Sequence, residues 1–415
     1  MEVLPLNAIV YNQNKVDMKD VVAPPYDVID EKYQDELYAR SEYNCVRLIL
    51  NKSDDRYAES AKVFNELKEK EILVHTDKPS IFYIVQKYKN EKGKMIERKG
   101  FIARNKIEDF ESKKVLPHEF TMGGPKEDRF KLVSATGAFY SQIFMVYNDE
   151  AQRIEKEIAS KYLSQKPYMD IVDDLGIQNL VYLIDEPDDI KVIQEVLANK
   201  TLLIADGHHR YETSMRYAKE HPKNEYAQYV MSYFTNAADE NLVIYPTHRI
   251  IEKNISPKDV LEAVKKHYDV IEMTDKDEFL DKIEQENKNQ ITTGLILRND
   301  EKYYVLKLKN GVKEAINQAK ELQNLDLTVL HEVILKGELG FSQEELMAQN
   351  GIKYEKKESV SFESVKEGKA NACFIMAYPK MKDIIDISSA GLRMPQKSTY
   401  FYPKLLSGIV INPLS

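Results

Sequence analysis

The stretch Leu202-Leu203-Ile204-Ala205-Asp206-Gly207-His208-His209-Arg210-Tyr211 changes abruptly from apolar to polar residues. The apolar run at residues 201–205 predicts a buried strand, and residues 210–221 carry apolar side chains at helical spacing. Gly207 stands at the junction, where a tight turn needs a residue with a permissive backbone. The sequence therefore predicts a strand, a turn and a helix whose first N–H groups point outward.

Such a helix entrance favours an anionic ligand, because its free N–H groups carry partial positive charge. Arg210 can hold phosphate with paired hydrogen bonds, and Gly207 lets the backbone approach the ligand closely. His208 and His209 can donate hydrogen bonds or exchange protons, and Asp206 can bind a divalent metal or accept a proton. In the alternative interpretation Asp206 only caps the helix and both histidines are ordinary surface residues.

Around this turn the chain predicts a mixed α/β fold. A helix is expected at residues 56–72, strands at 81–88, 99–104 and 140–147, and a βαβ-like segment at residues 180–205. We expect an N-terminal α+β region at residues 1–150, a core at 151–255 that contains the turn, and a C-terminal α+β region at 256–415 whose tail returns to the site.

Composition excludes several classes of protein. The 415 residues have a formal net charge of -9, which argues against a nucleic-acid partner. No leader and no spanning run is found, so the expected location is the cytoplasm, with no membrane partner. Phosphate-loop, dinucleotide-binding, H-E-x-x-H and G-x-S-x-G motifs are absent, so any catalysis uses a less common arrangement. The sequence leaves the oligomeric state open.

Other polar clusters qualify as parts of a site. A predicted loop contains His118, Glu119 and Thr121 and, after Gly123-Gly124-Pro125, Lys126 and Arg129; it reads either as acid/base and anion-binding groups or as a solvated charged loop. The C-terminal tail offers Lys397, Ser398, Thr399 and Lys404 as a phosphate clamp, or its aromatic residues merely dock the chain end. Asp27 follows a rigid Pro24-Pro25 pair, and His248 and Arg249 follow a predicted strand.

These motifs resemble those of domain-of-unknown-function family 1015 over nearly the whole chain. The matching segments are Ala205 to Tyr211, Ala23 to Asp27, Leu116 to Glu119, Pro125 to Arg129, Pro246 to Arg249 and Met394 to Lys404. The turn is also similar, more distantly, to the phosphate-binding turn of the ParB/sulfiredoxin superfamily, which includes kinases of free L-serine. This resemblance implies a ParB/sulfiredoxin-like core with additional α+β regions. The sulfiredoxin cysteine is missing, since His208 stands in its place.

The resemblance implies a phosphotransferase acting on free L-serine or a similar small hydroxylated metabolite, with ATP, ADP or pyrophosphate as donor and Mg2+ as cofactor. Asp206, Glu119 and His209 are the expected catalytic residues, and Asp206 is the expected metal ligand. The phosphate-binding residues would be Gly207, His208, His209, Arg210, Lys126, Arg129, Lys397, Ser398, Thr399 and Lys404. The substrate would contact Asp27, His118, Thr121, His248 and Arg249. The alternatives are a nucleotide-binding regulatory ParB-like module and a phosphate-ester hydrolase.

Overall fold

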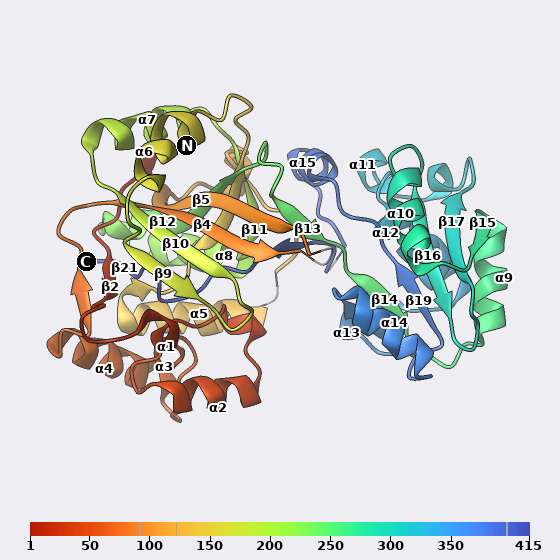
Figure 1. Ribbon diagram of the computed structural model, residues 1–415, viewed down its shortest axis with the longest axis horizontal. Coiled ribbons are helices and arrows are strands. Elements are labelled where there is room, and N and C mark those ends of the chain that lie inside the picture. Colours follow the sequence, from red (N-terminus) through yellow and green to blue (C-terminus); the bar gives the residue numbers. More distant parts are fainter. Residues whose placement is uncertain (91–92, 122, 396) are drawn as a thin grey trace. The chain divides into compact units, whose positions relative to one another are not determined.

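The computed structural model describes residues 1–90, 93–121, 123–395 and 397–415 (Figure 1). The chain forms two compact units: unit 1 is Met1–Val243 with Pro403–Ser415, and unit 2 is Ile244–Tyr402. Both combine helices with sheets, which confirms the predicted mixed α/β class. These units do not coincide with the three predicted regions, because strands from both sides of residue 150 share one sheet.

Unit 1 contains a nine-stranded sheet within the described residues, in the order β6-β11-β8-β12-β5-β4-β10-β9, with β1 paired to β5. Its strands are β1 (Val3–Leu4), β4 (Ile81–Lys89), β5 (Met95–Lys106), β6 (Val115–Leu116), β8 (Ile143–Tyr147), β9 (Met169–Val172), β10 (Gln178–Ile184), β11 (Leu202–Asp206) and β12 (Tyr229–Asn236). Two-stranded pairs join β2 (Ile9–Tyr11) to β3 (Leu73–His75) and β7 (Ala138–Phe139) to β21 (Asn412–Pro413).

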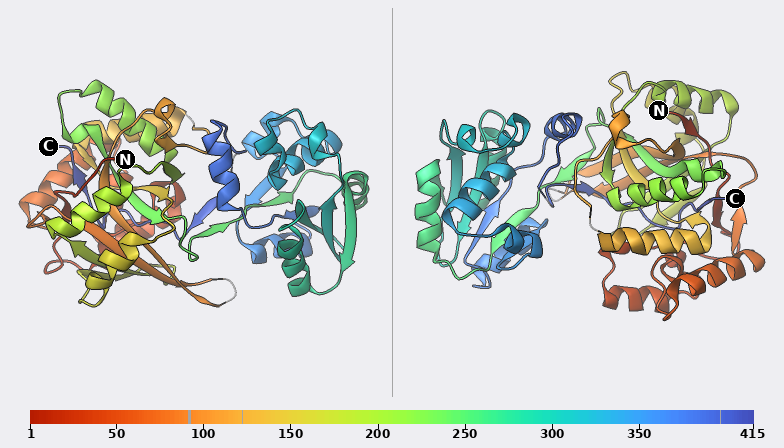
Figure 2. Two further views of the ribbon diagram at one scale, coloured as in Figure 1. Left: turned by 90° about the horizontal axis from the view of Figure 1, so that it is seen from above. Right: turned by 180° about the vertical axis from the view of Figure 1, so that it is seen from behind.

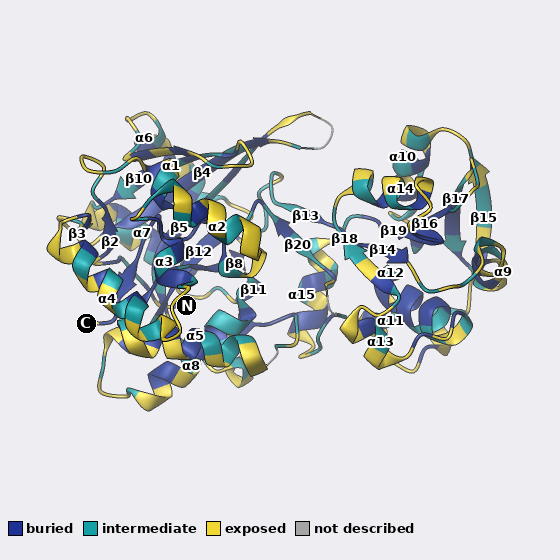
Figure 3. Ribbon diagram, turned by 90° about the horizontal axis from the view of Figure 1, so that it is seen from below, coloured by how far each residue is buried: buried dark blue, intermediate teal, exposed yellow. Residues whose placement is uncertain are grey.

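The sheet strands are buried on both faces, and alternate residues divide between the two sides. On β5, Phe101 and Ala103 join the main core cluster. Arg98, earlier on the same strand, lies on the other face, over the rings of Phe144 and Tyr233. Figure 3 shows the buried strands and the exposed outer sides of the helices around them. Burial on both faces explains why the apolar strand signals in the sequence were strong.

The helices of unit 1 bury apolar faces against this sheet and one another. They are α1 (Met18–Val21), η1 (Tyr26–Val28), α2 (Glu31–Arg40), α3 (Val46–Ile49), α4 (Arg56–Glu69), η2 (Phe110–Ser112), α5 (Gly123–Thr136), η3 (Ile154–Ala159), α6 (Ser160–Leu163), α7 (Pro187–Leu197), α8 (His208–Glu220) and η4 (Tyr226–Gln228). The π-helical η3 runs directly into α6. Helices α5 and α8 pack side by side (Figure 2, right).

Two local predictions need correction. Residues 180–205 form strand, helix and strand as expected, but β10 and β11 are separated by β4, β5, β12 and β8 in the sheet. The predicted loop after Thr121 is partly helical, because α5 begins at Gly123. Pro125 is compatible with the first helical turn, where its missing N–H would have no intrahelical partner.

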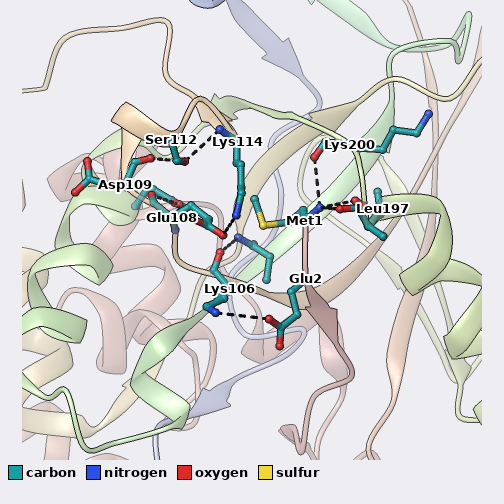
Figure 4. Close-up of polar contacts among 12 residues, drawn as sticks. Met1, Glu2, Lys106, Glu108, Asp109, Ser112, Lys114, Leu197 and Lys200 are labelled. Atoms are coloured by element: carbon teal, nitrogen blue, oxygen red, sulfur yellow. Dashed lines mark hydrogen bonds and ion pairs between the residues drawn. The ribbon is translucent and has the colours of Figure 1, made fainter.

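The amino group of Met1 is buried at the C-terminal end of α7 (Figure 4). It donates hydrogen bonds to the carbonyl oxygens of Leu197 at 2.6 Å and Ala198 at 2.5 Å. A cation is favoured there because the last carbonyls of a helix carry partial negative charge. Burial lowers the pKa of this amine, as does nearby Lys114.

Acetylation of the Met1 amine will destabilise unit 1 by about 1 to 3 kcal/mol, because the acetyl group removes charged hydrogen bonds and has to fit into a buried site. Denaturant unfolding of acetylated and free chains measures the difference. The same acetyl group on the exposed Lys113 is the control and should be nearly neutral. Equal stability of all three forms would contradict the assigned role of the amine.

Unit 2 is built around a six-stranded sheet within the described residues, in the order β15-β17-β16-β19-β14-β18, with antiparallel neighbours throughout. The strands are β14 (His248–Ile251), β15 (Tyr268–Met273), β16 (Thr292–Leu297), β17 (Tyr303–Leu308), β18 (Ile352–Glu355) and β19 (Ala372–Ile375). A separate pair joins β13 (Val243–Tyr245) to β20 (Tyr400–Tyr402).

One face of the unit 2 sheet packs against α10 and α14. Gly294 on β16 permits the close approach of α10, because a Cβ atom there would lie 2.5 Å from side-chain atoms of Ile283 and Phe279. The helices of unit 2 are α9 (Pro257–His267), α10 (Lys276–Glu286), η5 (Lys313–Ala315), α11 (Lys320–Gln323), α12 (Asp326–Val329), η6 (Leu330–Glu338), α13 (Gln343–Ala348), α14 (Glu358–Lys366) and α15 (Met381–Ser389). No helix among the described residues is long and apolar enough to span a membrane.

Candidate functional site

The predicted turn lies in unit 1, between the end of β11 and the start of α8. The register of β11 against β8 shifts between Ile204 and Asp206, the last residue of the strand. Gly207 follows with φ 96°, a left-handed conformation that favours glycine, and serves as the N-cap of α8. A side-chain cap is absent from this helix start. The local geometry therefore leaves the helix entrance available to an anion.

Asp206 binds two cationic side chains of unit 1. One carboxylate oxygen accepts a hydrogen bond from the Lys404 ammonium, and the other accepts one from Arg210 Nη2 at 2.7 Å. Burial opposes ionisation of Asp206, yet Lys404 and Arg210 outweigh it and hold the pKa of this carboxyl well below its usual range. Arg210 also donates to the carbonyl of Gln142. The C-terminal segment of the chain is thus fixed to the start of α8.

These contacts bear on three roles considered for Asp206. It does not cap α8, because its oxygens face Lys404 and Arg210 and the N-cap is Gly207. A carboxylate with a strongly lowered pKa is a poor proton acceptor, so Asp206 is unsuited to be the general base. Across the described ranges, no group of three or more His, Cys, Asp or Glu side chains is placed to hold an ion, and the metal role of Asp206 stays a prediction. Asp206 instead positions two cations.

His118 and Glu119 reach the turn because β6 runs parallel to β11 and ends beside it. His118 Nδ1 lies 2.8 Å from the carbonyl oxygen of Ile204, and its backbone N–H donates to His208 Nε2 at 3.2 Å. The acceptor role of Nε2 places the proton of a neutral His208 on Nδ1, which is 3.9 Å from Glu119 Oε2. The two imidazole rings are roughly perpendicular, with centroids 4.7 Å apart. Glu119 and these histidines form one polar cluster.

Thr121 and Lys126 meet on a residue that the sequence did not single out, Glu212 of α8. Thr121 donates to both carboxylate oxygens of Glu212 at 2.9 Å, and Lys126 Nζ donates to Oε2 at 2.7 Å. Glu212 is one helical turn after His208, and residues four apart share one face of a helix. This spacing in the predicted helix was the sequence signal that could have identified Glu212 as part of the site. These contacts fix the start of α5 against α8.

His209, the second residue of α8, is influenced by several charged side chains. Burial lowers the pKa of its imidazole, Lys126 acts in the same direction, and the carboxylates of Glu212, Asp27 and Glu119 act in the opposite direction. The ring is therefore mainly neutral at pH 7. The carboxylate of Asp27, in η1, is exposed and has no hydrogen bond or ion pair to any described residue. Asp27 thus offers an uncommitted carboxylate near the His209 ring.

Arg129 was predicted to bind phosphate, and its side chain contacts other parts of unit 1. Its guanidinium donates to Asp128 and to the carbonyl of Ile49, and it lies over the Tyr26 ring at 4.1 Å. Together with Arg210 and Tyr26, Arg129 lines a small cavity of about 40 Å³. These contacts hold Arg129 against η1, and its predicted role in phosphate binding stays a prediction.

The remaining predicted site residues belong to unit 2. His248 Nδ1 accepts the Met376 N–H at 3.2 Å, and burial lowers the pKa of His248 to about 3. Arg249 is fully buried and donates to the carbonyl of Lys397 at 3.1 Å and to His331 Nε2 at 3.3 Å. Ser398 donates to the carbonyl of Pro395, while Gln396 of the predicted tail motif lies outside the described residues. The roles proposed for His248, Arg249, Lys397, Ser398 and Thr399 in a shared site stay predictions.

Replacement of Gly207 by alanine will destabilise the fold by about 1 to 3 kcal/mol, because the left-handed backbone at Gly207 is unfavourable for alanine. The substitution will also displace Arg210. A Cβ atom here would lie 3.0 Å from the guanidinium carbon of Arg210. Thermal and denaturant unfolding measure the loss.

Gly137→Ala is the matched control. Gly137 also has a positive φ, 63°, but apart from its chain neighbours a Cβ atom at that position would meet no atom within 4 Å. The control therefore separates backbone strain from the contact with Arg210. A smaller loss at Gly207 than at Gly137 would contradict the proposed crowding.

Comparisons with known proteins give one family match and several similar solved structures. The family described as "Protein of unknown function (DUF1015)" matches residues 3–328. Free serine kinase in complex with AMP is a similar solved structure, with 15% identity, TM-score 0.36, and coverage of 74% of this chain and 92% of that chain. A conserved hypothetical protein from Pyrococcus furiosus has 17% identity, TM-score 0.35, and coverage of 73% and 93%. C-terminally truncated SbnI from Staphylococcus aureus has 9% identity, TM-score 0.34, and coverage of 74% and 85%. None of the curated proteins compared with the chain matches it.

Proposed function

The chain belongs to the DUF1015 family, and we propose that it is a phosphotransferase that phosphorylates free L-serine or a similar small hydroxylated metabolite. The observation that carries this proposal is the ion-pair cluster of Asp206, Arg210 and Lys404 at the start of α8, which has no side-chain cap. Phosphoryl transfer depends on positioning and charge neutralisation more than on covalent chemistry. Helix N–H groups with fixed ammonium and guanidinium groups provide both. The serine acceptor rests on the resemblance of the turn to free-serine kinases.

The donor phosphates would bind at the helix entrance. Asp206 holds Lys404 and Arg210 there, and each of these cations carries several N–H donors that suit phosphate oxygens. Gly207 lets the donor approach the backbone, and Lys126, held by Glu212, adds a third cation. We assign Asp206 and Glu212 as positioning residues, because they act through the cations that they hold.

Asp27 is the carboxylate best placed to be the general base. The other carboxylates of the site already have partners. Asp206 forms ion pairs with Lys404 and Arg210, and Glu212 accepts hydrogen bonds from Thr121 and Lys126. Glu119 lies near His118 and His208. In the proposed step Asp27 accepts the proton of the acceptor hydroxyl, the hydroxyl oxygen forms a bond to phosphorus, and the bond between phosphorus and the donor's leaving oxygen breaks. The neutral His209 ring would donate a hydrogen bond to the transferring group. Glu119 is the competing candidate for the base.

No group of three or more His, Cys, Asp or Glu side chains among the described residues is placed to hold Mg2+. Since Mg2+ commonly retains water and binds substrate phosphates, we propose that a magnesium ion would enter as part of the donor complex. Whether ATP, ADP or pyrophosphate is the donor is decided by assay.

Purified protein incubated with L-serine, Mg2+ and each donor in turn should produce phosphoserine, detected by mass spectrometry, with at least one donor. Loss of donor without phosphoserine would favour the phosphate-ester hydrolase. Unchanged donor and no phosphoserine in every reaction would reject the kinase. Replacement of L-serine by other small hydroxylated metabolites in the same assay tests the acceptor separately from the reaction.

A further inference from the structure

Unit 2 contains a cavity of about 450 Å³, a volume within the range of small-molecule sites. Its walls come from the segment after α10, the segment after β17, the start of α12 and the start of α15. The lining is mainly polar and includes side-chain amides such as Asn287 and Asn324. These residues lie outside the site proposed for phosphoryl transfer.

The charges of this cavity are of both signs, and its half-buried cations are not paired with its carboxylates. Lys309 and Lys313 are the cations in question. Lys309 Nζ donates to the carbonyls of Lys265 at 2.7 Å and Lys266 at 3.3 Å, and Lys313 Nζ donates to the amide oxygen of Asn324 at 2.7 Å. Both ammonium groups therefore have neutral acceptors, although carboxylates line the same cavity.

Two of the carboxylates accept no hydrogen bond from a charged side chain of the described residues. Asp326 accepts the backbone N–H of its neighbour Leu327, and no hydrogen bond to the Asp383 carboxylate comes from any described residue. Burial raises the pKa of Asp326 to about 6; the charges of Asp383 and Glu284 add to this effect, and that of Arg249 opposes it. Burial also raises the pKa of Asp383, although nearby Lys380 and Lys382 act in the opposite direction. A cationic group placed between Asp326 and Asp383 would relieve the cost of keeping both ionised.

We propose that this cavity binds a zwitterionic amino acid, with its ammonium group at Asp326 and Asp383 and its carboxylate at Lys309 and Lys313. A ligand with one charge of each sign satisfies both sets, whereas a polyanion such as a nucleotide would bring its phosphates against the two carboxylates. The amides of Asn287 and Asn324 would bind a polar side chain of the ligand. The proposal does not depend on the phosphotransferase activity of unit 1.

Isothermal titration calorimetry of the full chain with each common protein amino acid tests this proposal, with inorganic phosphate and ammonium chloride as single-charge probes. At least one amino acid should bind, and Asp383→Asn and Lys313→Met should each weaken it by about tenfold or more, equivalent to about 1.4 kcal/mol. Asp386→Asn is the matched control, because Asp386 is exposed at the same cavity and pairs with Lys382. It should change the affinity much less.

Binding of no amino acid would overturn the proposal. So would an amino acid whose affinity is unchanged in both Asp383→Asn and Lys313→Met, since it would bind elsewhere, for example at the acceptor site of unit 1. Phosphate binding that strengthens in Asp383→Asn, without amino-acid binding to the unsubstituted chain, would identify an anion site instead. Thermal unfolding of each variant confirms that the protein titrated is folded.

Discussion

Replacing Asp206 by asparagine will destabilise unit 1 by about 3 kcal/mol or more, because two partly buried cations lose their counter-charge. The same substitution will reduce phosphotransfer, since Arg210 and Lys404 are then held only by their remaining contacts. Denaturant unfolding and the phosphoserine assay measure the two effects. The control is Asp109→Asn, which removes an exposed ion pair to Lys219 and should cost less than about 1 kcal/mol.

The stability difference between the Asp206→Asn variant and the unsubstituted chain should depend on pH. The pKa of Asp206 is lowered in the folded chain, and that of an unfolded aspartate is about 3.9. The contribution of Asp206 to the free energy of unfolding is therefore fully present above about pH 4 to 5. It is lost as the pH falls further toward the folded-state pKa. A difference that stays constant from about pH 7 to about pH 3 would contradict the ion-pair assignment.

Replacing Asp27 by asparagine will lower kcat by a factor of about 100 to 10,000, the usual contribution of a general base. The fold should be unaffected, because the side chain is exposed and has no partner among the described residues. Steady-state kinetics with serine and the active donor give the effect, and thermal unfolding gives the control for folding. A structural role would instead lower stability and activity together.

Two matched variants make this test specific. Glu31→Gln removes another exposed carboxylate of the same region and should leave kcat unchanged. Glu119→Gln distinguishes the competing base: if it lowers kcat by the larger factor while Asp27→Asn has little effect, the base is Glu119 and our assignment of Asp27 is wrong.

The sequence predicted the turn because its signals are local. An apolar run, a glycine and a helical pattern follow one another within a few residues, and β11, Gly207 and α8 have the expected arrangement. It also predicted that Lys404 reaches the turn, but only through the motif resemblance. No local pattern could give this contact, since 198 positions separate Lys404 from Asp206.

The remaining features depend on pairing and burial, which a single sequence does not encode locally. His118 reaches His208 through the parallel pairing of β6, a strand of two residues that is too short to give a pattern. The ionisation of Asp206 depends on its partners, so its role as a positioning residue was hidden. Glu212 was missed because one acidic residue in a polar helix is ordinary until Thr121 and Lys126 are seen to bind it.

A crystal structure of the chain with a non-reactive donor analogue and L-serine tests the central claim most directly. We predict donor phosphate oxygens within hydrogen-bond distance of the backbone N–H groups at the start of α8, with Arg210 and Lys404 as further donors and the serine hydroxyl facing Asp27. A donor bound at a place that contacts neither the Gly207 turn nor Arg210 would contradict it.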